Sequence, residues 1–249
     1  MINKLRLLRN KSTTVNEIIN VYPLTIGEIE DIGEEDYRMY LNCLLIDKNS
    51  LNSEGLSREE KKEFNKITPL DTLLLYCHQD LEFRRITEES FLIFTKEEVE
   101  YSINDEHPIG CFYFYVEGNK ILLDNNLFNE FRTILMKQNY LQDQQSSSGF
   151  KPANNKATEL MERMNKIKEK LNKQNKEESL PLSEIVSIVS AYSNDVNILT
   201  VWDLTIFQLY ELYARLLLWD SYHNDYIHLP HMEKEDQEKI SKNHWAKKL

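Results

Sequence analysis

Glycine and proline, the residues that most often interrupt regular structure, are scarce in this chain. Only 6 glycines and 6 prolines occur among its 249 residues. An all-β sandwich needs many tight turns, and tight turns rely heavily on these two residue types. The composition therefore argues against that class and favours helices joined by short connections.

Cysteine is scarce too, and its pattern argues against a disulfide framework. Cys43, Cys77 and Cys111 are odd in number, widely separated and set among apolar residues, as is typical of reduced core thiols. No stretch approaches the roughly 18 consecutive apolar residues that a membrane-spanning helix needs. The first residues also lack the apolar region and cleavage site of a signal peptide. We therefore expect a cytoplasmic chain that does not bind a membrane.

The charge balance makes nucleic acid an unexpected partner. The formal net charge is -11, whereas phosphate binding depends on clustered lysine and arginine. Two short basic stretches exist, one before Glu17 and one at residues 151–180, which carries 8 basic and 5 acidic side chains. Runs of this size are usually solvated faces of helices or tails. Hydrophobic residues at 41% nevertheless predict a folded protein.

Several helix starts can be recognised in the first half of the chain. A serine or threonine followed three residues later by an acid can form a capping box, as at Thr25 with Glu28 and Ser57 with Glu60. Thr68-Pro69 is the clearest start, because proline already has the backbone angle of a first helical turn. With apolar residues at helical spacing, these starts predict helices from 26 to the glycine at 33, at 34–47, at 58–65, from 69 through 77, and at 125–139.

A small antiparallel sheet is expected between residues 83 and 123. Residues 91–94 and 111–116 are short aromatic and branched runs, and 121–123 is a third apolar run. Gly118-Asn119 between the last two predicts a hairpin turn, with glycine supplying a positive φ.

The chain divides into two predicted domains. Residues 142–150 have the composition of a flexible connector. We therefore expect an N-terminal α+β domain at 1–141, a linker at 142–154 and an all-α domain at 155–249. Within the last, helices are expected at 155–173, at 184–192 and after a capping box formed by Thr205 and Gln208. The predicted fold class is α+β and predominantly helical, with one small antiparallel sheet.

No pattern of catalytic residues is present. The sequence contains no G-x-S-x-G, no phosphate-binding glycine loop and no C-x-x-C. Cys77-His78 and Cys111 with His107 are sequence neighbours whose side chains should point apart. The sharpest metal candidate combines three histidines with two acids, but its spacing matches no metal signature: His223, His228, His231, Asp220 and Asp225. We assign no catalytic, cofactor or metal residue and expect a chain that is not an enzyme.

The last third of the chain is rich in aromatic residues, including all three tryptophans. Most of these rings should pack in a core, but a small helical region cannot bury all of them, and exposed Trp and Tyr are preferred anchors of protein interfaces. We therefore predict a protein-binding role for Trp202, Phe207, Tyr210, Tyr213, Trp219, Tyr222 and Trp245.

Five stretches resemble a family encoded in tailed bacteriophages and in prophages of Gram-positive bacteria. They are residues 21–30 (VYPLTIGEIE), 32–37 (IGEEDY), 149–155 (GFKPANN), 200–210 (TVWDLTIFQLY) and 244–249 (HWAKKL). The family comprises tail assembly chaperones and related tail-morphogenesis proteins. The resemblance implies a non-enzymatic chaperone in the host cytoplasm that binds the tape measure protein, with the tail tube protein and a second copy of the chain as further partners. The alternative that it leaves open is a permanent component of the virion tail, baseplate or connector.

Overall fold

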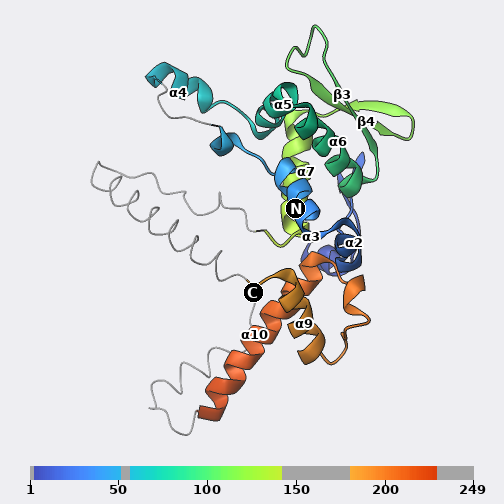
Figure 1. Ribbon diagram of the computed structural model, residues 1–249, viewed down its shortest axis with the longest axis vertical. Helices are drawn as coiled ribbons and strands as arrows, with labels where there is room; N and C mark the ends of the chain where they lie inside the picture. The colour runs from blue at the N-terminus through green and yellow to red at the C-terminus, as the bar shows by residue number, and fades with distance from the viewer. Residues whose placement is uncertain (1–2, 52–56, 142–179, 229–249) are drawn as a thin grey trace. The chain divides into compact units, whose positions relative to one another are not determined.

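The computed structural model describes residues 3–51, 57–141 and 180–228, and its contacts divide the chain into two compact units. The first unit contains residues 1–141 and 202–208, and the second contains residues 142–201 and 209–249. Figure 1 shows mostly helices, with the strands in the first unit. The predicted class, α+β and predominantly helical, is confirmed. The predicted linker at 142–154 and helix at 155–173 lie outside the described residues.

The first unit opens with a short helix and a hairpin that were not predicted from the sequence. A short helix, α1 (Lys4–Leu8), precedes a hairpin of β1 (Thr13–Val15) and β2 (Ile19–Val21), whose strands pair antiparallel. Each strand has only three residues. So short a strand leaves almost no alternation of apolar and polar residues to recognise.

The helix starts predicted at Thr25 and Thr68 are present, and a capping box is formed at each of them. Thr25 accepts a hydrogen bond from the Glu28 amide at the start of α2 (Ile26–Ile32), and Thr68 does the same for Asp71 in α5 (Pro69–Gln79). Gly33, with a φ of 96°, separates α2 from α3 (Glu34–Leu44). A 3-10 turn, η1 (Lys48–Ser50), and α4 (Arg58–Phe64) come before α5. The predicted helix at 34–47 therefore ends earlier than expected.

The prediction of a strand at 91–94 is wrong. These residues belong to α6 (Leu81–Thr95), which Asp80 caps by accepting hydrogen bonds from the amides of Glu82 and Phe83. Phe91 and Phe94 are buried, whereas the intervening Leu92 is exposed. The apolar run therefore follows a helical period, which four residues taken alone could not reveal.

The three-stranded sheet has the order β3-β4-β5, with β3 (Glu98–Ser102), β4 (Cys111–Val116) and β5 (Asn119–Leu122). The β4–β5 hairpin was predicted, but its turn is shifted by one residue: Glu117 and Gly118 both have positive φ, and Asn119 begins β5. Strand β3 was missed because two of its residues are glutamates. Gly110 precedes β4 with a φ of 98°, and a Cβ built there would lie 2.1 Å from the Tyr101 ring.

An aromatic cluster joins the helices of the first unit to this sheet. The Phe91 ring of α6 lies 5.5 Å from that of Phe112 and 5.2 Å from that of Phe114, both on β4. It also lies 6.4 Å from Phe128 and 5.4 Å from Phe131, both on α7 (Asn125–Gln138). All five rings are buried, so they form one hydrophobic core that is shared by the sheet, α6 and α7.

Polar side chains of α7 tie it to other elements of the first unit. Arg132 donates to the carbonyl oxygen of Leu45 over 2.9 Å, just past the end of α3, where helix carbonyls lack partners. Gln138 donates to the carbonyl oxygen of Val21 on β2 over 3.0 Å. These bonds satisfy buried backbone groups that packing alone would leave unpaired.

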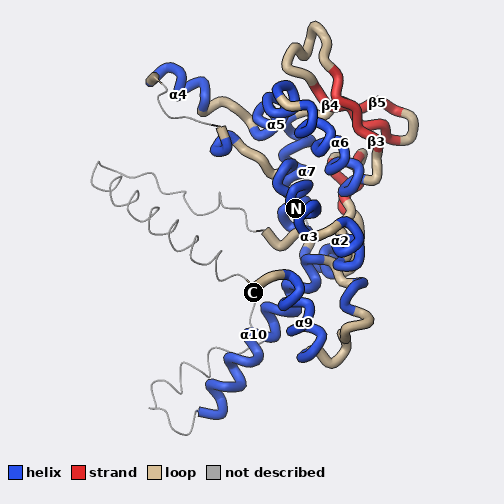
Figure 2. The backbone as a smooth tube through the Cα atoms, in the orientation of Figure 1, coloured by secondary structure: helices blue, strands red, loops and turns tan. Residues whose placement is uncertain are grey.

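The regular structure in the described part of the second unit is helical. It contains α9 (Leu182–Tyr192) and the greater part of α10 (Ile206–His228). Between them in sequence, the 3-10 turn η3 (Val201–Asp203) leads into the capping box at Thr205, which belongs to the first unit and whose amide donates to the side-chain oxygen of Gln208 over 2.8 Å. Figure 2 shows these helices in blue and the strands of the first unit in red.

The aromatic cluster makes a direct prediction about stability. Phe91→Ala should lower the free energy of unfolding by about 3–5 kcal/mol, because it removes a buried ring and leaves a cavity. Leu92→Ala, at the exposed neighbouring position, should cost less than about 1 kcal/mol. Urea unfolding followed by circular dichroism measures both. Equal losses in the two variants would contradict the central place of the Phe91 ring.

Candidate protein-binding surface

Phe207, one of the aromatic residues predicted to bind a partner, packs in the core of the first unit. Its side chain is buried, and its ring lies 5.5 Å from that of Tyr140. The preceding residues are held there by the backbone, since the Ile26 amide donates to the carbonyl oxygen of Leu204 over 2.8 Å and Thr25 pairs with Thr205. Phe207 is therefore not accessible in this structure.

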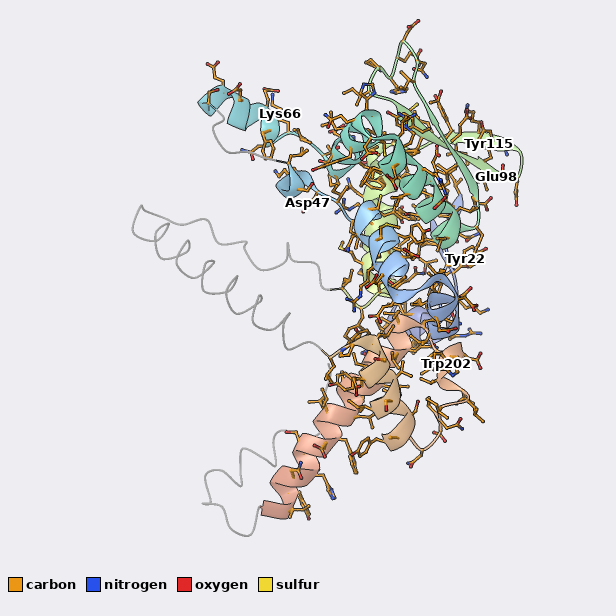
Figure 3. The ribbon with its side chains drawn as sticks, in the orientation of Figure 1. Tyr22, Asp47, Lys66, Glu98, Tyr115 and Trp202 are labelled. Carbon is orange, nitrogen blue, oxygen red and sulfur yellow. The ribbon has the colours of Figure 1, made fainter. Side chains whose placement is uncertain are left out.

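Trp202 lies in the turn before α10 and also belongs to the first unit (Figure 3). Its carbonyl oxygen would lie 3.3 Å from a Cβ built on Gly27, so the backbones of the two residues approach closely. The indole keeps substantial exposure. Trp202 therefore combines a packing role with an accessible edge.

The burial of α10 falls steadily along the helix. Leu209 is completely buried, and Glu211 is almost so. Further on, Leu217 is 52% exposed and Tyr226 is 59% exposed, with Trp219 and Ile227 similarly accessible. A helix in water normally places such residues against other apolar groups, so these residues mark a surface suited to a partner.

Helix α9 contributes the other side of this surface. Ile185, Val186 and Val189 are buried, whereas Tyr192 at its end is exposed. Between α9 and α10 lies a hollow of about 300 Å³, which we call the α9–α10 hollow. It is lined by Ile188, Tyr192, Leu216, Leu217, Trp219 and Asp220. Asp220 is the only charged residue in this lining, so the hollow suits an apolar side chain.

Ring stacking orders the exposed aromatic residues of α10. The rings of Trp219 and His223 are stacked with centroids 5.1 Å apart, and those of Tyr222 and Tyr226 are 6.3 Å apart. Both pairs are four residues apart, a spacing that brings side chains together on one helix face. Rings ordered in this way lose less conformational entropy when a partner binds.

The structure brings only part of the predicted set to this surface. Trp219 lines the α9–α10 hollow, and Tyr222, further along α10, stacks on Tyr226. Tyr210 and Tyr213 lie half-buried nearer the start of the helix. Trp245 lies outside the described residues.

Sequence reasoning missed the aliphatic part of the surface. Leu216 and Leu217 line the hollow but were not among the residues predicted to bind a partner. Residues 216–219 form a run of four apolar residues within a helix. Because successive helical residues point about 100° apart, such a run cannot face a single core, and it could have identified the surface.

The histidine and acid cluster gains no support as a metal site. Among residues 3–51, 57–141 and 180–228, no three His, Cys, Asp or Glu side chains are placed to hold an ion. His223 is stacked on Trp219, and His228 is the last residue of α10. His231 lies outside the described residues.

The cysteines are core thiols. Cys43 on α3 and Cys77 on α5 both contact the hydroxyl oxygen of Thr87 on α6, with Sγ–Oγ1 distances of 3.0 and 3.4 Å. Burial raises the pKa of Cys43 to about 11 and that of Cys77 to about 12. Both thiols are therefore protonated at neutral pH, unlike the thiolate that a nucleophile requires.

A comparison with known protein families finds a match to the part of the chain that contains this surface. Residues 172–249 match the family model of the YomV second domain, a span that includes α9 and α10 but less than half of the chain. YomV is a Bacillus phage-region protein, so the match is consistent with a phage protein. No curated protein and no solved structure matches the chain. Within the described part of the chain, none of the helices has the length and apolar character needed to cross a bilayer.

Thiol burial can be tested by chemical modification. At pH 8, the folded chain should react with Ellman's reagent far more slowly than the chain in urea, because Cys43, Cys77 and Cys111 are all buried. The raised pKa values of Cys43 and Cys77 stabilise the fold fully below the unfolded-state pKa near 8.5 and lose that contribution as pH rises toward 11 and 12. Rapid modification of any thiol in the folded chain at pH 8 would overturn this assignment.

Proposed function

We propose that this chain is a non-enzymatic phage protein that binds an apolar helical segment of another protein through the α9–α10 hollow and the exposed second half of α10. The observation that carries the proposal is the concentration of accessible apolar side chains on one helix, with Leu217, Trp219 and Tyr226 exposed. Proteins that act alone rarely leave such residues grouped in water.

The geometry supports recognition of a helix more than recognition of an extended peptide. The hollow lies between two helices, and its exposed neighbours continue along α10 rather than along a strand edge. An amphipathic helix binds such a surface by inserting side chains spaced three or four residues apart. Tryptophan and tyrosine provide large contact areas with few rotatable bonds, so Trp219 is the expected anchor.

We further propose that the partner is the phage tape measure protein and that the chain acts as a tail assembly chaperone. Two observations support this assignment. Several stretches resemble tail assembly chaperones, and residues 172–249 match a domain of a phage-region protein. A chaperone of this kind would cover apolar helical segments of the tape measure protein until the tail is assembled. The tail tube protein and a second copy of the chain are secondary candidates.

Co-expression of the full chain with tape measure segments tests this proposal. The double variant Leu217→Ser/Trp219→Ser should lower the affinity for those segments by at least about tenfold, because it removes two exposed apolar contacts. Leu199→Ser is the matched control, since Leu199 is 83% exposed and does not line the hollow. Affinity is measured by titration of purified chains, and circular dichroism confirms that each variant is folded.

Two results would count against the proposal. If the unmodified chain formed no complex with any tape measure segment, the partner assignment would fail. If both variants bound as well as the unmodified chain, the surface assignment would fail instead. Mass spectrometry of purified particles then separates a chaperone from a virion component: the chaperone is abundant in the lysate and absent from particles.

A further inference from the structure

Helix α5 carries apolar residues on two of its faces. Leu70, Leu73 and Cys77 are buried at helical spacing and face the core of the first unit. Leu75, about 200° around the helix from Leu73, lies on the opposite side, and Leu74 lies at the edge of the buried row; both are only half-buried. The core therefore accounts for one apolar face of α5 and leaves the other accessible.

This second face forms the floor of a groove in the first unit. The groove has a volume of about 970 Å³ and is open to solvent; we call it the α4–α5 groove. Its apolar lining consists of Phe64, Ile67, Leu74, Leu75 and Ile109. These residues come from the end of α4, the connection to α5, α5 itself and the loop before β4. Ile109 is exposed and the other four are half-buried, so the floor of the groove offers apolar side chains that a partner could contact.

Carboxylates surround this apolar floor. Glu59, Glu60, Glu63 and Asp71 line the groove together with a single basic residue, Lys66. Lys66, labelled in Figure 3 beside α4, lies 2.6 Å from the carboxylate of Glu63, so it is already paired. Among the lining residues, the balance of charge is therefore strongly negative.

Two of these carboxylates also have structural roles. Glu60 accepts a hydrogen bond from the Ser57 amide over 2.7 Å, and Asp71 accepts one from the Thr68 amide over 2.8 Å. The Ser57 amide holds the pKa of the Glu60 carboxyl below its usual value, so this group stays charged. Glu59 and Glu63 on α4 are exposed and take no part in these capping bonds. Glu59 and Glu63 can therefore be substituted to test the role of negative charge around the groove without removing a helix cap.

We propose that the α4–α5 groove docks an amphipathic segment of another protein, with apolar side chains on the floor and flanking lysine or arginine residues beside Glu59 and Glu63. Charge complementarity selects this occupant: a rim of carboxylates repels nucleic-acid and lipid phosphates and attracts basic side chains. The site differs from the α9–α10 hollow, whose lining holds one acid and no base. It would give the chain a second partner-binding surface of different chemistry.

The test uses the full chain and a synthetic peptide of about 16 residues, long enough to form a helix, with leucines on one face and flanking lysines. Fluorescence anisotropy measures affinity. Two comparison peptides replace either the leucines by serine or the lysines by glutamate. The leucine and lysine peptide should bind with at least about tenfold higher affinity than either comparison peptide. Its affinity should fall as the salt concentration rises, because salt screens the contacts between lysine and glutamate.

Matched variants locate the site. Leu75→Ser should weaken peptide binding by about tenfold, whereas Leu81→Ser, at a position 74% exposed and outside the groove, should not change it. Glu59→Gln/Glu63→Gln should weaken binding and reduce its salt dependence, while Glu30→Gln/Glu106→Gln, at exposed positions outside the groove, should do neither.

Three outcomes would overturn the proposal. The first is that the serine-substituted peptide binds with the same affinity as the leucine and lysine peptide. The second is that the groove variants and their controls change the affinity equally. The third is that the chain associates with itself and Leu75→Ser abolishes this association, because a second copy of the chain would then be the occupant. The Leu217→Ser/Trp219→Ser variant distinguishes binding at the α4–α5 groove from binding at the α9–α10 hollow. It should bind the peptide like the unmodified chain, so failure at one surface leaves the other testable.

Discussion

The ring of Phe91 contacts aromatic rings on β4 and α7, and the arrangement of the first unit depends on those contacts. Because α6 is anchored there, its Thr87 hydroxyl meets the thiols of Cys43 and Cys77, which brings α3 and α5 against the same helix. The inward face of α5 is thereby assigned to the core. Its other apolar residues, Leu74 and Leu75, remain accessible in the α4–α5 groove.

The second unit shows the opposite balance between apolar residues and packing. Burial is complete at Leu209 but has largely disappeared by Leu217, although apolar and aromatic residues continue to Ile227. Helix α9 covers only part of this length, and the α9–α10 hollow remains between the two helices. Within α10, the buried contacts therefore lie near its start, and binding is proposed for the remainder. This division matches the trade between packing and function that binding sites commonly show.

Local chemistry was predictable, and contacts between distant residues were not. The capping boxes at Thr25, Ser57 and Thr205 could be recognised because all of their atoms lie within four consecutive residues. The burial of Phe207 depends on Tyr140, a neighbour far away in sequence, so its aromatic character alone suggested a binding residue. The α4–α5 groove was missed for the same reason, since Ile109 joins it from a separate loop.

Hydrogen exchange of the full chain in isolation tests the central claim that the second half of α10 is an accessible surface. Amides of residues 217–228 should exchange much faster than those of α6 around Phe91, because few buried contacts oppose local opening there. Mass spectrometry of peptic fragments from the monomeric chain measures both regions in one experiment. Equal protection of the two regions would show that the exposed half of α10 is already covered, and would contradict the proposed binding surface.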